Sequence, residues 1–184
     1  MYPTKIEVNG NIYNLNTDFR VAIACFKAIN DYEITDRERL LAVEGLLIKE
    51  DVNRFDETEL IRKIGIYLRC GDEENTSEEE VDMDYVQDEI KVKTSIRQCY
   101  GLNLNEVEYM HWWEYNELIS GLTGDSLINK IRELRSMDVS EIQDEKLREQ
   151  VIKNQERVAL KKYIPKTDEE KELDDFWDKI LGGD

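Results

Sequence analysis

The chain opens with two short runs in which apolar and polar residues alternate, on either side of Asn9 and Gly10. The runs are Lys5 to Val8 and Asn11 to Leu15. Alternation places the apolar side chains on one face of a strand, and Asn-Gly is a preferred two-residue hairpin turn. The pattern predicts a short N-terminal β-hairpin.

After residue 16 the apolar spacing changes to that of amphipathic α-helices. Thr17 or Asp18 can cap a first helix that ends near Asn30. Its apolar positions are Phe19, Ala22, Ile23, Phe26 and Ile29. Residues at this spacing share one side of a helix, so this helix is expected to face a core.

Two further helices are predicted before Gly71. Asp36 can cap the second helix and Asp56 the third, which stops at Gly71. Their apolar stripes are Leu40, Val43 and Leu47 in the second helix, and Leu60, Ile61, Ile64, Tyr67 and Leu68 in the third.

Helical periodicity resumes from Val81 to Tyr100, and Gly101 is a good helix terminator. The apolar positions of this helix are Val86, Ile90, Ile96 and Cys99. A short aromatic-rich helix is predicted from Tyr109 to Leu122. Gly121 and Gly124 end it and predict a tight helical corner.

Two more helices are predicted in the last third of the chain. Asp125 or Ser126 can cap the first of them, which has the apolar face Leu127, Ile128, Ile131 and Leu134. Ser140 can cap a long helix with few apolar positions that reaches Tyr163, and Pro165 ends it.

The last stretch, residues 167–181, is amphipathic in a different way, because acidic residues surround a large apolar face. That face consists of Leu173, Phe176, Trp177, Ile180 and Leu181. A helix with these groups exposes them unless it docks on its own domain, on another copy or on a target. These five residues are therefore candidates for partner binding.

The elements together predict a mainly α fold. It consists of a multi-helix bundle with a short N-terminal β-hairpin and an amphipathic C-terminal helix. We expect a helical core domain over residues 1–135, with an acidic loop at 71–82, and a helical C-terminal extension over residues 136–184.

The formal net charge of -17 limits the kinds of partner that this chain can bind. Such a charge repels nucleic acids and anionic membranes and favours a basic protein partner. Residues 71–90 hold ten acidic residues and no basic one. The longest apolar stretch, Val21 to Ile29, is too short to span a membrane and contains Lys27.

Catalytic and metal-binding patterns are weak. His111 is the single histidine, and no nucleophile elbow, Gly-rich phosphate loop or HExxH surrounds it. It could pair with Glu114 at a metal, but a carboxylate-bridged bundle needs two such motifs. The three cysteines lack a CxxC pattern, which suggests neither a disulfide framework nor a zinc site. We therefore expect a non-enzymatic protein without a cofactor, in a reducing cytoplasm.

Trp112 and Trp113 stand in the most informative stretch of the chain. Adjacent helical residues point about 100 degrees apart, so both rings can be buried only at a junction of two packing surfaces. They are interpreted first as core anchors. The alternative is that one of them belongs to a partner-binding groove, where aromatic residues are enriched.

Three segments of the sequence resemble the bacteriophage gene-product-fifteen family, whose members occur in tailed phages and prophages of Gram-positive bacteria. The segments are Cys99 to Leu104, Met110 to Leu122 and Ile131 to Asp138. The resemblance mainly covers residues 85–162. It implies a tail-assembly chaperone that is made in the host bacterial cytoplasm, binds the tape measure protein and is absent from the finished virion.

The leading hypothesis is therefore a chaperone that binds the tape measure protein, with the tail tube protein as a second partner. A long tape measure requires several copies, so we also expect self-association. The binding surface is expected on the helices after Ser140. Two alternatives stay open: an acidic nucleic-acid mimic that inhibits a basic DNA-binding protein, and a structural component of the tail.

Overall fold

The computed structural model describes residues 1–52, 57–73 and 82–161, and it begins with the predicted hairpin. Strands β1 (Lys5–Val8) and β2 (Asn11–Asn14) pair antiparallel. Asn9 and Gly10 between them have φ angles of 48° and 80°. Two successive positive φ angles are what a type I′ turn requires. The side chains that the hairpin buries are Ile6, Val8 and Tyr13.

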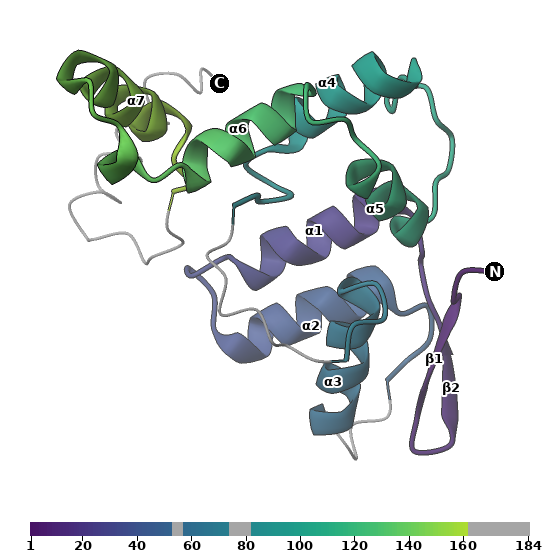
Figure 1. Cartoon of the computed structure of the whole chain (residues 1–184). Helices are drawn as coiled ribbons and strands as arrows, with labels where there is room; N and C mark the ends of the chain where they lie inside the picture. Colours follow the sequence, from purple (N-terminus) through teal and green to yellow (C-terminus); the bar gives the residue numbers. More distant parts are fainter. Residues whose placement is uncertain (53–56, 74–81, 162–184) are drawn as a thin grey trace, which may run out of the picture.

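In the described ranges seven α-helices and one 3-10 helix follow the hairpin, which confirms the mainly α fold (Figure 1). The bounds are α1 (Phe19–Ile29), α2 (Asp36–Leu47), α3 (Glu57–Leu68), α4 (Glu89–Tyr100), α5 (Trp112–Ser120), α6 (Leu127–Ser136), η1 (Val139–Glu141) and α7 (Glu145–Val158).

Helices α1 and α2 pack against each other. Asp18, one of the two predicted caps, caps α1 by accepting a hydrogen bond from the Arg20 amide. The predicted cap of α2 is wrong, because Thr35 rather than Asp36 occupies that position. Thr35 and Glu38 form a capping box, in which each side chain accepts from the other residue's backbone N–H, so two otherwise unpaired donors are satisfied.

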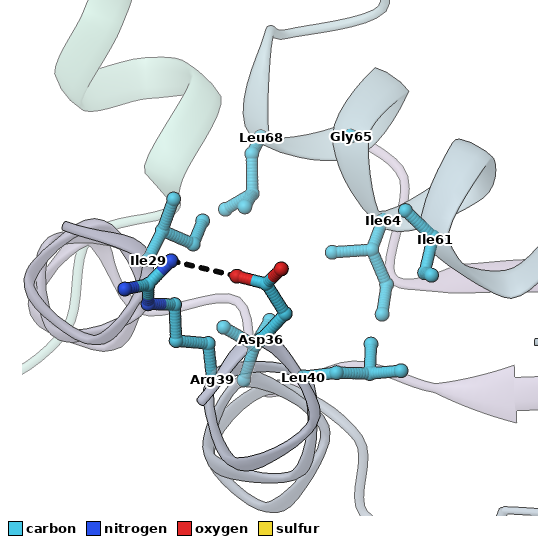
Figure 2. Close-up of a pocket in the computed structure, with 9 residues that line it drawn as sticks. Ile29, Asp36, Arg39, Leu40, Ile61, Ile64, Gly65 and Leu68 are labelled. Atoms are coloured by element: carbon cyan, nitrogen blue, oxygen red, sulfur yellow. Dashed lines mark hydrogen bonds and ion pairs between the residues drawn. The ribbon is translucent and has the colours of Figure 1, made fainter. Parts of the chain in front are cut away.

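Helix α3 packs on β1, and a pocket separates it from α2 (Figure 2). Its predicted cap, Asp56, lies outside the described residues. Ile61 belongs to the predicted apolar stripe, yet its side chain is 51% exposed because it borders this pocket. The other four members of the stripe are buried: Leu60, Ile64, Tyr67 and Leu68.

Residues 110–113, called the hub below, connect α5 to the N-terminal part of the chain. The Phe19 amide donates to the Met110 carbonyl, and the Trp112 amide donates to the Thr17 carbonyl at 2.8 Å. His111 caps α5, since its Nδ1 accepts from the Trp113 amide. Its Nε2 lies 3.0 Å from the carbonyl oxygen of residue 3 and must carry the proton, because Nδ1 is an acceptor.

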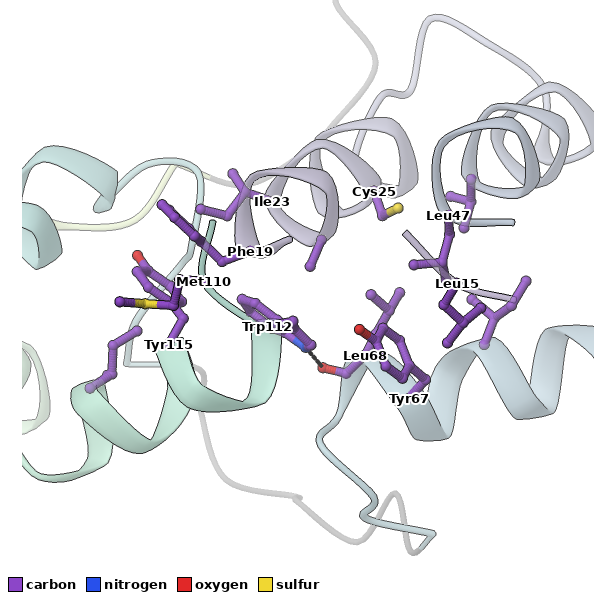
Figure 3. Close-up of a cluster of buried hydrophobic side chains, with 14 of the residues drawn as sticks. Leu15, Phe19, Ile23, Cys25, Leu47, Tyr67, Leu68, Met110, Trp112 and Tyr115 are labelled. Atoms are coloured by element: carbon purple, nitrogen blue, oxygen red, sulfur yellow. Dashed lines mark hydrogen bonds between the residues drawn. The ribbon is translucent and has the colours of Figure 1, made fainter. Parts of the chain in front are cut away.

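The two tryptophans of the hub hold the C-terminal end of α3. The indole N–H of Trp112 donates to the Leu68 carbonyl (Figure 3), and that of Trp113 donates to the Tyr67 carbonyl, both at 3.0 Å. The last carbonyls of a helix lack partners within the helix, so these bonds are useful there. Trp112 is fully buried and Trp113 half-buried, which confirms the core-anchor interpretation for Trp112.

Helix α4 begins later than predicted, and only part of its predicted apolar stripe faces the core. The Asp84 carboxylate accepts from the amides of Val86 and Gln87, so the chain forms a turn there instead of a helix. Helix α4 therefore begins at Glu89, and Ile90 is 80% exposed rather than buried. The residues of α4 that do face the core are Val92, Ser95 and Ile96. Gly101 ends the helix with a φ of 67°, as predicted.

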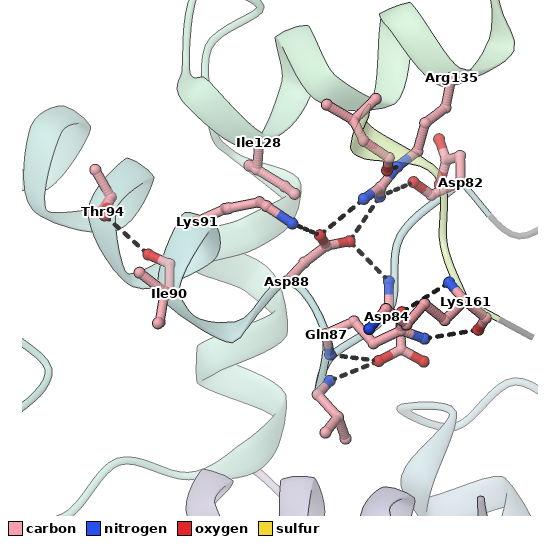
Figure 4. A network of polar contacts seen from close by, with 12 residues as sticks. Asp82, Asp84, Gln87, Asp88, Ile90, Lys91, Thr94, Ile128, Arg135 and Lys161 are labelled. Carbon is pink, nitrogen blue, oxygen red and sulfur yellow. Dashed lines mark hydrogen bonds and ion pairs between the residues drawn. The ribbon is translucent and has the colours of Figure 1, made fainter. Parts of the chain in front are cut away.

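A buried ion pair joins α4 to α6. Asp88 is fully buried and contacts Arg135 at 2.6 Å and Lys91 at 2.7 Å (Figure 4). The Arg135 guanidinium also donates to the carbonyls of Asp82 and Val158, so it connects three segments. Burial acts to raise the pKa of Asp88, but the hydrogen bonds from Arg135 and Lys91 outweigh it and lower that pKa below its usual value.

Helix α7 also differs from its prediction. Asp144 caps it, whereas Ser140, the predicted cap, lies in the 3-10 helix η1. Ser140 donates its amide to Asp138, which begins this separate turn. Helix α7 packs on α6 and η1, buries none of its own residues and lies at one side of the molecule (Figure 1). The domain boundary after residue 135 falls at the end of α6 and stays a prediction.

Replacement of Asp88 by Asn should destabilise the protein by about 3–5 kcal/mol at neutral pH, because Arg135 then keeps a buried charge without its partner. Urea denaturation followed by circular dichroism measures this change. The matched control is Asp125→Asn, whose side chain is 96% exposed and pairs with Lys130 at the surface. That variant should lose less than about 1 kcal/mol.

The effect of Asp88→Asn should also depend on pH. A carboxylate with a lowered folded pKa contributes stability above its unfolded pKa, and that contribution disappears as the pH falls through the folded value. Wild type and variant should therefore converge in stability below pH 3.8, the usual value of Asp. A difference that stays constant down to pH 2 would contradict the role of the ion pair.

The two tryptophans should differ in their effect on stability. Trp112→Phe leaves a cavity and a buried carbonyl without a donor, so it should cost about 3 kcal/mol. Trp113→Phe removes the same hydrogen bond at a half-buried position and should cost roughly 1 kcal/mol. Denaturation midpoints of the two variants measure this, and an equal loss in both would show that burial does not distinguish them.

Candidate functional site

The structure describes two of the seven predicted binding residues, Trp112 and Trp113. Trp112 contributes no surface to a partner because it is fully buried. The ring of Trp113 packs over Gly71, where an added Cβ would lie 3.0 Å from the ring. The five remaining residues lie outside the described part of the chain: Leu173, Phe176, Trp177, Ile180 and Leu181.

Three side chains of the described ranges that could act in catalysis or metal binding have structural partners. Both ring nitrogens of His111 are hydrogen-bonded, one to a backbone amide and one to a carbonyl. Asp84 shapes a turn and Asp88 pairs with Arg135. Among the described residues no group of three or more His, Cys, Asp or Glu side chains could hold a metal ion. No helix of these ranges is long and apolar enough to cross a membrane.

The strongest candidate site is the pocket between α2 and α3, called the α2–α3 pocket below. Its volume is about 330 Å³. Figure 2 shows side chains of α3 facing those of α2 across it, with Ile29 at the end of α1 on one side. The residues that line it are Ile29, Asp36, Arg39, Leu40, Val43, Ile61, Ile64, Gly65 and Leu68.

The pocket exists because its two walls are packed in different directions. Helix α2 packs on α1, whereas α3 packs on β1 and is held at its end by the hub. The facing sides of the two helices therefore do not close on each other. Gly65 adds no side chain to the wall, and a Cβ there would lie 3.0 Å from the Arg69 guanidinium.

The wall of the pocket is apolar and its margin is charged. Ile61 is 51% and Ile29 39% exposed, which is unusual for large aliphatic side chains in a concave surface. Arg39 stands at the margin, where it pairs with Asp36 at 2.8 Å, donates to a backbone carbonyl and covers the ring of Tyr32 at 4.6 Å. An apolar groove with a polar margin is a common seat for one face of an amphipathic helix.

The sequence pattern predicted only that the apolar lining residues lie on amphipathic helix faces, so it did not identify the pocket. The available signal was the width of the α3 stripe, in which Leu60 and Ile61 are both apolar although adjacent residues point apart. One of them packs inward and the other borders the pocket. Only the arrangement of α2 beside α3 turns the second position into part of a site.

A second hollow, of about 270 Å³, lies beside α4 and has a more polar lining. It includes Lys93, Arg97 and Asn103 together with the exposed Ile90. Its mixed lining offers few apolar contacts to a partner helix. Ile90 is therefore a useful reference position for tests of the α2–α3 pocket.

The chain matches the model of a known protein family. Residues 2–160 match the family described as Bacteriophage Gp15 protein. The match includes the hairpin, α1 to α3 and the α2–α3 pocket, which the sequence resemblance had covered only loosely, and it ends beside Lys161. No curated protein and no solved structure matches the chain. Because the matched residues make up most of its length, this chain belongs to the Bacteriophage Gp15 protein family.

Proposed function

We propose that this protein is a non-enzymatic tail-assembly chaperone, which binds the tape measure protein in the host bacterial cytoplasm during assembly of a phage or prophage tail. The observation that carries the proposal is the α2–α3 pocket, an open apolar site in a chain of net charge -17. Membership of a bacteriophage family supports the phage setting. The tail tube protein is proposed as a second partner.

The chemistry of the pocket fits a helical partner with an apolar stripe. Apolar residues at i, i+3, i+4 and i+7 of such a helix lie in one row, and a pocket of about 330 Å³ can receive the larger of them as anchors. A long tape measure helix exposes many such stripes before the tail tube surrounds it. An acidic binding protein that covers them keeps the complex in solution, and several copies serve one tape measure.

The described side chains support a role without catalysis. Both ring nitrogens of His111 form hydrogen bonds that shape the hub. Burial raises the pKa of Cys25 to about 12 and that of Cys70 to about 11. Both thiols are therefore protonated at neutral pH, whereas a nucleophilic cysteine needs its thiolate.

Replacement of Ile61 by Glu should weaken binding of the tape measure protein by at least about tenfold, since a charge in the apolar pocket costs well over 1.4 kcal/mol when the partner covers it. Titration calorimetry with a tape measure segment from the same phage genome measures the affinity. The control is Ile90→Glu, which adds the same charge at a position that is 80% exposed on α4.

Equal affinities of the two variants would remove the pocket from the interface. The salt dependence of binding separates the proposal from nucleic-acid mimicry. Contact between apolar surfaces should persist at 1 M salt, whereas a complex that depends on acidic surface charge should weaken strongly there.

Purified virions should lack this chain, because an assembly chaperone leaves before the particle is complete. Mass spectrometry of virions from the same phage, compared with the infected-cell lysate, provides the measurement. Recovery of the chain in amounts similar to a known tail protein would assign it to the structural components instead.

A further inference from the structure

The α2–α3 pocket and the apolar residues near the end of the chain both expose apolar surface unless something covers them. The tail segment, defined here as residues 167–181, carries five large apolar residues at helical spacing. We propose that the tail segment of the same molecule occupies the α2–α3 pocket, with Phe176 and Trp177 as its anchors, until a partner helix displaces it. The displacement step rests on the proposed function, whereas the docking does not.

The tail segment starts close enough to reach the pocket. Lys161 and Gln87 exchange two hydrogen bonds, which hold the end of the described chain beside the start of α4. Two residues from Gln87, the ring of Tyr85 stacks on Phe26 of α1 with centroids 5.0 Å apart. Phe26 precedes Ile29, a wall residue of the pocket, by three residues.

This short series of contacts therefore connects Lys161 to the wall of the pocket. The twelve residues from Lys161 to Leu173 span roughly 40 Å when extended. This length exceeds the distance that the few side-chain contacts between Lys161 and Ile29 cover. The tail segment can accordingly dock within one molecule, without a second copy.

Charge permits docking on this face of the molecule. The tail segment contains seven acidic and two basic residues, so most of an acidic chain repels it. Helices α2 and α3 together with Arg69 carry five acidic and five basic residues. The guanidinium groups of Arg39 and Arg69 stand at the pocket, one in its lining and the other against Gly65.

Size and composition agree as well. A pocket of about 330 Å³ with an apolar wall suits one or two large side chains rather than a polar ligand. On a helix Phe176 and Trp177 would be neighbours, with Leu173 and Ile180 three or four residues away on the same face. Docking covers the exposed parts of Ile29 and Ile61 and the apolar face of the tail segment at once.

An internal occupant changes how the protein selects its partner. A helix must compete with the tail segment, so the apparent affinity falls by the fraction of molecules with a free pocket. Short or weakly apolar helices then fail to bind, whereas a long helix with repeated stripes succeeds. Coverage of the pocket also protects the free chain from association through it.

Fluorescence of Trp177 in the full-length protein tests the docking directly. The difference between the emission spectra of wild type and Trp177→Phe isolates Trp177, since Trp112 and Trp113 contribute equally to both. We expect blue-shifted emission that acrylamide quenches poorly. Ile61→Glu should shift this emission to that of a solvent-exposed tryptophan, whereas the matched control Ile90→Glu should leave it unchanged.

A second variant, Phe176→Asp, should also expose Trp177 and alters no residue of the described fold. Unchanged circular dichroism of each variant verifies folding. Emission typical of a solvent-exposed Trp177 in the wild type overturns the proposal. Emission of a buried Trp177 that stays unchanged in Ile61→Glu overturns it as well. A blue shift that disappears on dilution overturns it in favour of docking between two copies.

The displacement step has its own measurement. Phe176→Asp should bind a tape measure segment about tenfold more tightly than wild type, because the competitor is gone. An unchanged or lower affinity contradicts competition for the pocket. The fluorescence arm uses this chain alone, so a failure to bind the tape measure would refute the proposed function without affecting the docking result.

Discussion

The hub at residues 110–113 is the constraint on which the rest of the structure depends, because it bonds to three parts of the chain at once. Its backbone pairs with Thr17 and Phe19 at the start of α1. The ring of His111 connects residue 3 to the first turn of α5, and two adjacent indoles hold the end of α3. Segments far apart in sequence are thus fixed around one short stretch, which closes the core beneath them.

The α2–α3 pocket follows from this arrangement. The hub and β1 hold α3, while α2 packs on α1, and an ion pair between Arg37 of α2 and Glu57 of α3 at 3.7 Å lies outside the residues that line the pocket. Ile29 and Ile61 stay exposed and line a hollow with a charged margin, beside the buried Ile64 and Leu68. Helix α3 therefore contributes to both features, since Ile64 and Leu68 belong to the buried core and also line the pocket.

A second constraint sets where the C-terminal helices lie. Asp88 and Arg135 lose hydration when they are buried, and this cost is offset only while each keeps the other and its remaining hydrogen bonds. Because Arg135 also binds the carbonyl of Val158, the same pair positions the end of α7. The neighbouring bonds between Gln87 and Lys161 then hold the chain after α7 beside the start of α4. A polar network thus positions the end of the described chain.

The sequence by itself determined the features that depend on neighbouring residues. The turn at Asn9 and Gly10, the cap at Asp18 and the stop at Gly101 follow from backbone preferences that act within a few residues. Tertiary structure decided which apolar residues are covered, since that depends on contacts between distant elements. Periodicity could not tell that Ile90 faces solvent while Asp88 is buried, or that Ile61 borders a pocket, because a stripe shows which residues share a face but not what lies opposite.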